Sequence, residues 1–260
     1  MSAPAAVYVW SGAFRVDRSR ALDKLMRFQL PDPLMYLLPW LRAAVAAGAD
    51  RVELRTRTRL RRRCGIEVRF GGRPFSRRDL QDPYACLLER RIADHAAQRH
   101  LAIGILSVLR LAPKSIQIDS GDGSDRVSTT IESISKETIK PLQDGGSGTV
   151  LAVEFSGWPS AADFDYVRDA CRLVCLIPIV IDGREVERLN SSAYGHPFSD
   201  GPIHGYLSLP PDPRPETRLE LVVLGVRAGW AEVQLPWVQA GGWINDDQFT
   251  LNVSQTGVAK

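Results

Sequence analysis

The chain has 260 residues, of which 44% are hydrophobic and 24% are charged, and this globular composition allows one large core or a core with a satellite domain. The formal net charge of +3 is too small to indicate a nucleic-acid partner. We expect a cytoplasmic protein, because no apolar run approaches the roughly 20 residues that span a bilayer and the start lacks the pattern of a secretory signal.

Two helices are expected near the start of the chain. Residues 17–28 carry apolar side chains at helical spacing, with Asp17 or Ser19 as the N-cap. The second helix begins near Leu38, because the proline that follows is tolerated only in a first helical turn. Gly48 is a natural C-terminal cap, so we expect this helix to end there.

The pattern then changes to a period of two residues, which is typical of a strand with one covered face and one wet face. Apolar and threonine side chains of residues 51–60 point one way and Arg55, Arg57 and Arg59 the other. Residues 66–70 are expected to return as the partner strand. The arginine face is interpreted as a solvated surface. A nucleic-acid interface or an acidic protein partner are the alternatives, although no aromatic side chains interleave with the arginines.

The rest of the chain alternates helices and strands and then changes composition. From about residue 190 prolines cluster in "SLPPDPRPETR" and short strands follow, which predicts a second, β-rich unit. The elements expected in between are a helix over roughly 77–99, a buried helix over 101–112, strands in "SIQIDSG", "SDRVSTTIES" and "GTVLAVEF", a helix over 160–177 capped by Ser160, and a hairpin around Asp182 and Gly183.

The four cysteines do not have zinc-binding spacing. Cys171 and Cys175 lie four residues apart, which would place them on one helix face. We interpret these two, with Cys64 and Cys86, as small apolar residues and not as a metal or redox site.

Four stretches resemble, in their order and spacing, the nucleotide-binding domain of the GHKL superfamily, which includes gyrase-type topoisomerases, HtpG-type heat-shock chaperones, histidine kinases and MutL. They are "WLRAAVAAGAD", "IEVRFGGRPFSRRDL", "RHLAIGILSVLRLAPKSIQIDSG" and "GTVLAVEF". A fifth, "DDQFTLNVSQTGV", is similar to a stretch in the domain that follows the ATPase in chaperone-type members. The resemblance implies an α+β, Bergerat-type sandwich, with a mixed, mostly antiparallel sheet and helices on one face. It divides the chain into a GHKL-like domain over 1–189 and the start of a middle, transducer-like domain over 190–260.

An ATPase of this family needs a carboxylate on the first site helix as general base and an amide one turn later for the metal ion. It also needs an aspartate before the glycine loop that reads adenine. The resemblance places Trp40, Ala44 and Phe70 at these three positions. A shift of register does not repair the helix, because the residues between Asp32 and Asp50 include no Asp, Glu, Asn or Gln.

Large apolar side chains in a polar pocket fill it, so we predict a pocket without catalytic residues, metal or cofactor. ATP or ADP with magnesium is the alternative. His100 is interpreted as a surface or capping residue, with contact to a phosphate-like anion as its alternative. The residues expected to line the degenerate pocket are Trp40, Ala44, Phe70, Gly71, Gly72, His100, Gly104, Ser107 and Thr149.

The expected function is that of a chaperone-like, catalytically silent module acting through protein interaction or conformational change. Its partner would be a protein that the sequence does not identify, with a homodimer as one form of that interaction. The alternatives are a divergent, ATP-dependent chaperone ATPase and a nucleic-acid binder that uses the arginine face. The chain is either a piece of a longer protein or a form that lacks the domains found in chaperone-type relatives.

Overall fold

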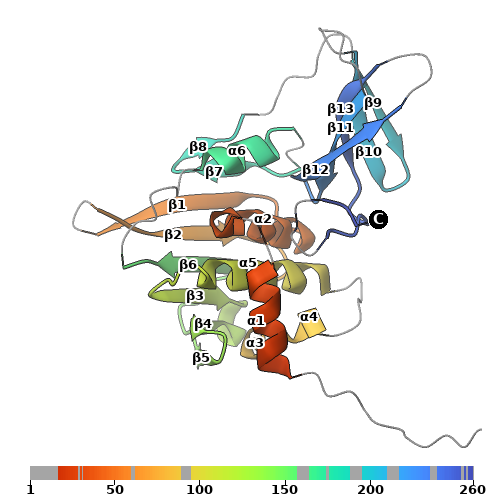
Figure 1. The fold of residues 1–260 in the computed structure, drawn as a ribbon. Helices are drawn as coiled ribbons and strands as arrows, with labels where there is room; N and C mark the ends of the chain where they lie inside the picture. Colours follow the sequence, from red (N-terminus) through yellow and green to blue (C-terminus); the bar gives the residue numbers. More distant parts are fainter. Residues whose placement is uncertain are drawn as a thin grey trace, which may run out of the picture.

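The computed structural model gives an α+β fold with two sheets and helices packed against them (Figure 1). No helix within the described ranges is long and apolar enough to cross a membrane. The structure describes residues 17–28, 30, 32–59, 62–88, 95–156, 164–173, 176–187, 195–209, 217–234, 239–252, 255 and 257–259.

The larger sheet has eight strands in the order β5-β4-β3-β6-β2-β1-β7-β8. Neighbouring strands are antiparallel except for β1 and β7, which run parallel, so the sheet is mixed and mostly antiparallel as predicted. The sequence did not indicate β5. The strands are β1 (Val52–Arg59), β2 (Arg62–Phe70), β3 (Ser115–Ser120), β4 (Val127–Ser133), β5 (Lys136–Pro141), β6 (Thr149–Glu154), β7 (Ile179–Ile181) and β8 (Arg184–Glu185).

The alternation in β1 and β2 places one face of this sheet in the core. Val52 pairs with Phe70 and Leu54 pairs with Val68, and all four side chains are buried. The intervening residues point to the opposite face, where arginine side chains such as Arg55 are exposed. β2 begins at Arg62, four residues before the strand expected at 66–70, so the turn expected over residues 61–65 is wrong.

The helices α1, α2 and α5 lie on the buried face of the sheet, and α2 packs along α5 (Figure 1). The short helix η1 leads directly into α2. The helices are α1 (Arg18–Phe28), η1 (Pro33–Tyr36), α2 (Leu37–Ala46), α3 (Arg77–Gln81), α4 (Ala85–Leu88), α5 (Ala96–Leu109), η3 (Gly123–Asp125) and α6 (Asp165–Cys171).

The predicted ends of the first two helices are confirmed. The Asp17 carboxylate accepts a hydrogen bond from the backbone N–H of Arg20 at 3.2 Å, as an N-cap does. Gly48 follows the end of α2 with a φ of 75°, a left-handed conformation that favours glycine. The hairpin at Asp182 and Gly183 is also present, between β7 and β8.

Two predicted helices are wrong in extent. The helix expected over 77–99 is interrupted after α3, because Asp82 leaves the helical conformation before Pro83. Of the helix expected over 160–177, the described residues form α6 from Asp165 to Cys171, and Arg172 is its C-cap. Ser160, Cys175 and the predicted domain boundary at residues 189 and 190 lie outside the described residues.

A second sheet has five strands in the order β12-β11-β13-β10-β9, with β11 and β13 parallel. Outside these strands, Leu251 makes an isolated antiparallel bridge to Val258. The sequence did not indicate β9 or β10. The strands are β9 (Gly195–Asp200), β10 (Ile203–Ser208), β11 (Thr217–Val223), β12 (Val226–Val233) and β13 (Gly241–Asn245).

The turn between β11 and β12 packs against α2. Leu224 and Ala228 form a small buried cluster, and Val45 and Ala46 of α2 pack against it. α2 therefore contacts α5 on one side and the five-stranded sheet on another, which explains why even its single charged residue is buried.

Candidate functional site

Trp40, which the resemblance assigns to the position of the catalytic carboxylate, is fully buried in the first half of α2. Its indole lies against Gly104 of α5, where an added Cβ would come within 2.3 Å of two ring atoms. The indole N–H donates a hydrogen bond to the Leu101 carbonyl at 3.3 Å. The Tyr36 ring meets the indole edge-on at a centroid distance of 5.0 Å. The indole thus occupies the space between α2 and α5.

Ala44, which the resemblance assigns to the position of the metal-binding amide, lies one turn after Trp40 and is fully buried. Its side chain has no polar atom that could hold a metal ion. Ser107, on the facing helix α5, donates its hydroxyl to the Ile103 carbonyl one turn earlier at 2.8 Å. Among the described residues, no three His, Cys, Asp or Glu side chains lie close enough together to hold a metal ion.

Phe70 and Thr149 are cross-strand partners at the ends of β2 and β6. The Phe70 ring, which the resemblance assigns to the position of the adenine-reading aspartate, is buried and meets Phe75 edge-on at a centroid distance of 6.4 Å. The Thr149 hydroxyl lies 2.7 Å from the Ser120 hydroxyl, which also accepts the backbone N–H of Phe75 at 2.9 Å. The hydroxyl groups at this end of the sheet are therefore bonded to one another and to the backbone.

The two loop glycines lie beside the end of α2. Gly72 has a φ of 80°, and an added Cβ would come within 2.5 Å of the Ala47 carbonyl oxygen. The next residue, Arg73, donates its backbone N–H to that carbonyl at 2.7 Å. At Gly71 an added Cβ would meet only the Asp50 carboxylate, at 3.6 Å. The close approach of the Ala47 carbonyl therefore explains why a glycine stands at position 72, and no bound ligand is needed to explain it.

His100 lies one turn before Gly104 on α5. Its residue surface is partly exposed, but Nδ1 is buried and has no hydrogen-bond partner among the described residues. Burial, followed by the nearby Arg42 and Arg99 guanidinium groups, lowers the pKa of His100 to about 3. The imidazole is therefore neutral at physiological pH and does not attract an anion by charge.

Arg42 was not among the residues predicted for the site, although it is the one charged side chain of α2. It is 1% exposed, and its Nη2 donates to the Arg227 carbonyl of β12 at 3.1 Å. Nε and Nη1 are buried without hydrogen-bond partners among the described residues. Burial lowers the pKa of Arg42 to about 10, so the group remains cationic at neutral pH.

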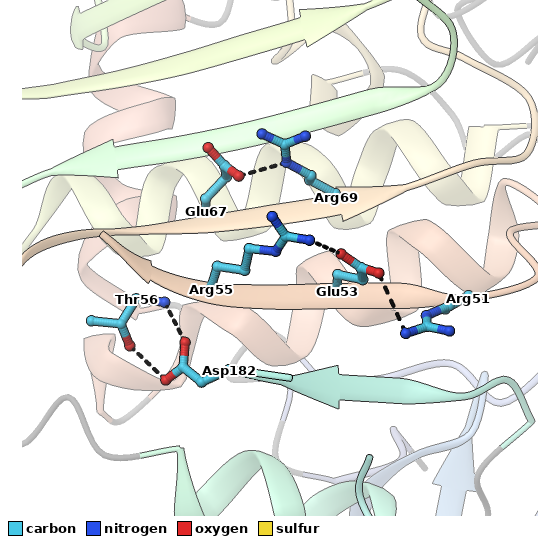
Figure 2. A network of polar contacts seen from close by, with 7 residues as sticks. All are labelled: Arg51, Glu53, Arg55, Thr56, Glu67, Arg69 and Asp182. Atoms are coloured by element: carbon cyan, nitrogen blue, oxygen red, sulfur yellow. Dashed lines mark hydrogen bonds and ion pairs between the residues drawn. The ribbon is translucent and has the colours of Figure 1, made fainter. Parts of the chain in front are cut away.

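The arginines of β1 lie on the open face of the larger sheet, where acidic residues accompany them (Figure 2). Glu53 forms one ion pair with Arg55 at 2.7 Å and another with Arg51 at 3.4 Å. On β2, Glu67 pairs with Arg69 at 2.5 Å. The face therefore carries charges of both signs. The Arg59 side chain lies outside the described residues.

A depression of about 250 Å³ lies on this face beside the bulge in β1. Gly65 forms part of its lining, and Arg57 and Glu154 contribute the charged groups. Glu154 also pairs with Lys114 at 2.9 Å. Arg57 and Glu154 thus line the same depression from two strands that are separated by β2.

No protein-family model matches the chain, and neither does any curated protein.

Proposed function

We propose that the chain is a chaperone-like module of the GHKL fold whose nucleotide site has eroded, and that it acts through protein interaction or conformational change. The observation that carries this proposal is the buried contact between Trp40 and Gly104. Under this proposal an indole replaces the general base, and hydrolysis needs a carboxylate or another base at that position to activate water.

Three further features support the same proposal. Ala44 offers no ligand to magnesium, so the phosphates of a nucleotide would lack the metal ion that neutralises charge during transfer. Phe70 offers no acceptor to the adenine amino group. Thr149 is already bonded to Ser120. The mixed eight-stranded sheet with helices against one face is compatible with the architecture that the resemblance implies.

The proposal is tested by light scattering from a reporter enzyme that aggregates on heating. We expect the full chain to lower the scattering to the same extent with and without magnesium-ATP. Serum albumin at equal mass is the control for non-specific protection. No decrease relative to albumin would contradict the proposal. A decrease that requires ATP, with phosphate release that saturates with ATP concentration, would instead support the divergent ATPase.

A further inference from the structure

Aromatic side chains from three strands of the five-stranded sheet lie in one row. Trp230 of β12 pairs with Glu220 of β11, and Glu220 pairs on its other side with Trp243 of β13. Trp243 in turn pairs with Tyr206 of β10. Direct cross-strand partners point to the same face of a sheet, so these four side chains cross one face in a line.

The row is exposed to solvent at Trp230, and at its other end Tyr206 lies beside a glycine of the edge strand β9. Trp230 is 51% exposed, which is unusual for so large an apolar side chain. The Tyr206 ring lies over Gly195 of the edge strand β9, where an added Cβ would come within 1.9 Å of the hydroxyl oxygen. His204 meets the Trp243 ring edge-on at 6.1 Å. We call Trp230, Trp243, Tyr206, His204, Arg218 and Glu220 the aromatic face.

Arg218 provides an example of a cation held on this face by an indole ring and a carboxylate. Its guanidinium lies 4.6 Å from the centre of the Trp230 ring and 3.6 Å from the Glu220 carboxylate. A cation is attracted to the face of an indole ring, and an adjacent carboxylate adds to that attraction. Arg218 also lies opposite Glu232 of β12 in the strand pairing, so acidic residues of both strands accompany it on this face.

We propose that the aromatic face binds a segment of a partner polypeptide that carries basic and apolar side chains. A lysine or arginine from the partner would lie over Trp243, between the Glu220 carboxylate and the Tyr206 ring, as Arg218 lies over Trp230. Apolar side chains would pack on Trp230. The carboxylate of Glu220 within the row disfavours a nucleic acid, whose phosphates need a positive surface beside the stacking platform. This inference rests on the proposed function and adds the location and chemistry of the partner site.

Fluorescence anisotropy with labelled short peptides tests the inference on the full chain. One peptide alternates arginine and leucine, and its counterpart has glutamate in place of arginine. We expect the arginine peptide to bind, and Trp230→Ala and Trp243→Ala each to weaken that binding about tenfold. Glu220→Gln should reduce the preference for arginine over glutamate. Phe28→Ala is the matched control, since Phe28 is an aromatic residue on α1 with 63% exposure, and it should leave binding unchanged.

Three results would overturn the inference: undiminished binding by both tryptophan variants, equal binding of the glutamate peptide, or tighter binding of a single-stranded oligonucleotide. The scattering assay on the same variants separates this inference from the proposed function. Peptide binding that depends on Trp230, without suppression of aggregation by the unchanged chain, would support the aromatic face and contradict the chaperone role. Suppression retained in both tryptophan variants would support the chaperone role and contradict the aromatic face as its partner site.

Discussion

The indole of Trp40 packs directly on the Cα of Gly104, so that each residue defines the space available to the other across α2 and α5. A larger residue at position 104 would collide with the indole, and a smaller residue at position 40 would leave a cavity. The pair therefore connects the substitution at the expected catalytic position with the stability of the fold.

A double-mutant cycle tests this contact. Gly104→Ala should lower the free energy of unfolding by about 1–3 kcal/mol, because the added methyl group overpacks the interface. In a Trp40→Ala background the same change should raise stability by up to about 1 kcal/mol, because alanine is a better helix former than glycine and the clash is gone. Urea unfolding measures all four proteins. A Gly104→Ala effect of the same sign in both backgrounds would contradict the packing described.

Arg42 offers a test of the buried charge between α2 and the five-stranded sheet. A buried charge without a carboxylate partner is costly, and its replacement by an apolar residue of similar volume is often neutral or stabilising. We expect Arg42→Met to melt at the same temperature as the unchanged chain or higher. Arg42→Lys keeps the charge and should melt lower. A decrease of several kcal/mol in the free energy of unfolding of Arg42→Met would contradict this, because it would show that interactions in the folded chain offset the cost of burying the guanidinium.

His100 predicts a dependence of stability on pH. The folded chain keeps the imidazole neutral down to a pKa of about 3, whereas the unfolded chain protonates it near 6.5. The unfolded state therefore binds more protons between these values, and stability falls as the pH decreases below about 6.5. The slope from this group should reach about 1.4 kcal/mol per pH unit.

The comparison with His100→Gln isolates that contribution. Urea unfolding at a series of pH values between 7 and 4 should show a shallower decline in the variant. Equal slopes in the two proteins would indicate that the imidazole is protonated in the folded chain as readily as in the unfolded one.

Local patterns predicted much of the first sheet and its helices. The alternation of Val52 and Leu54 with arginines, the cap at Asp17 and the turn at Asp182 each depend on a few neighbouring residues. The break after Gln81 was also visible in the sequence, because Pro83 disfavours a helical conformation at Asp82. The restriction that Pro83 places on Asp82 therefore outweighs the helical spacing of the residues on either side.

Pairing between distant segments was harder to predict. β9 and β10 contain Pro197, Gly195 and Gly205, and proline and glycine are depleted in strands. The extended conformation of these two segments therefore depends on their pairing in the folded sheet. In the candidate site, the family resemblance could place Trp40 and Ala44 at their positions. It could not show that Trp40 meets Gly104 across two helices, or that Arg42 reaches a carbonyl of β12.

Calorimetric titration of the full chain with ATP and with ADP, each with magnesium, tests the filled pocket most directly. A parallel thermal melt adds sensitivity, because a ligand at a hundred times its Kd stabilises the folded state by about 2.7 kcal/mol. The filled pocket predicts no saturable heat and no shift in Tm with either nucleotide. Saturable binding with a Kd in the micromolar range would contradict it.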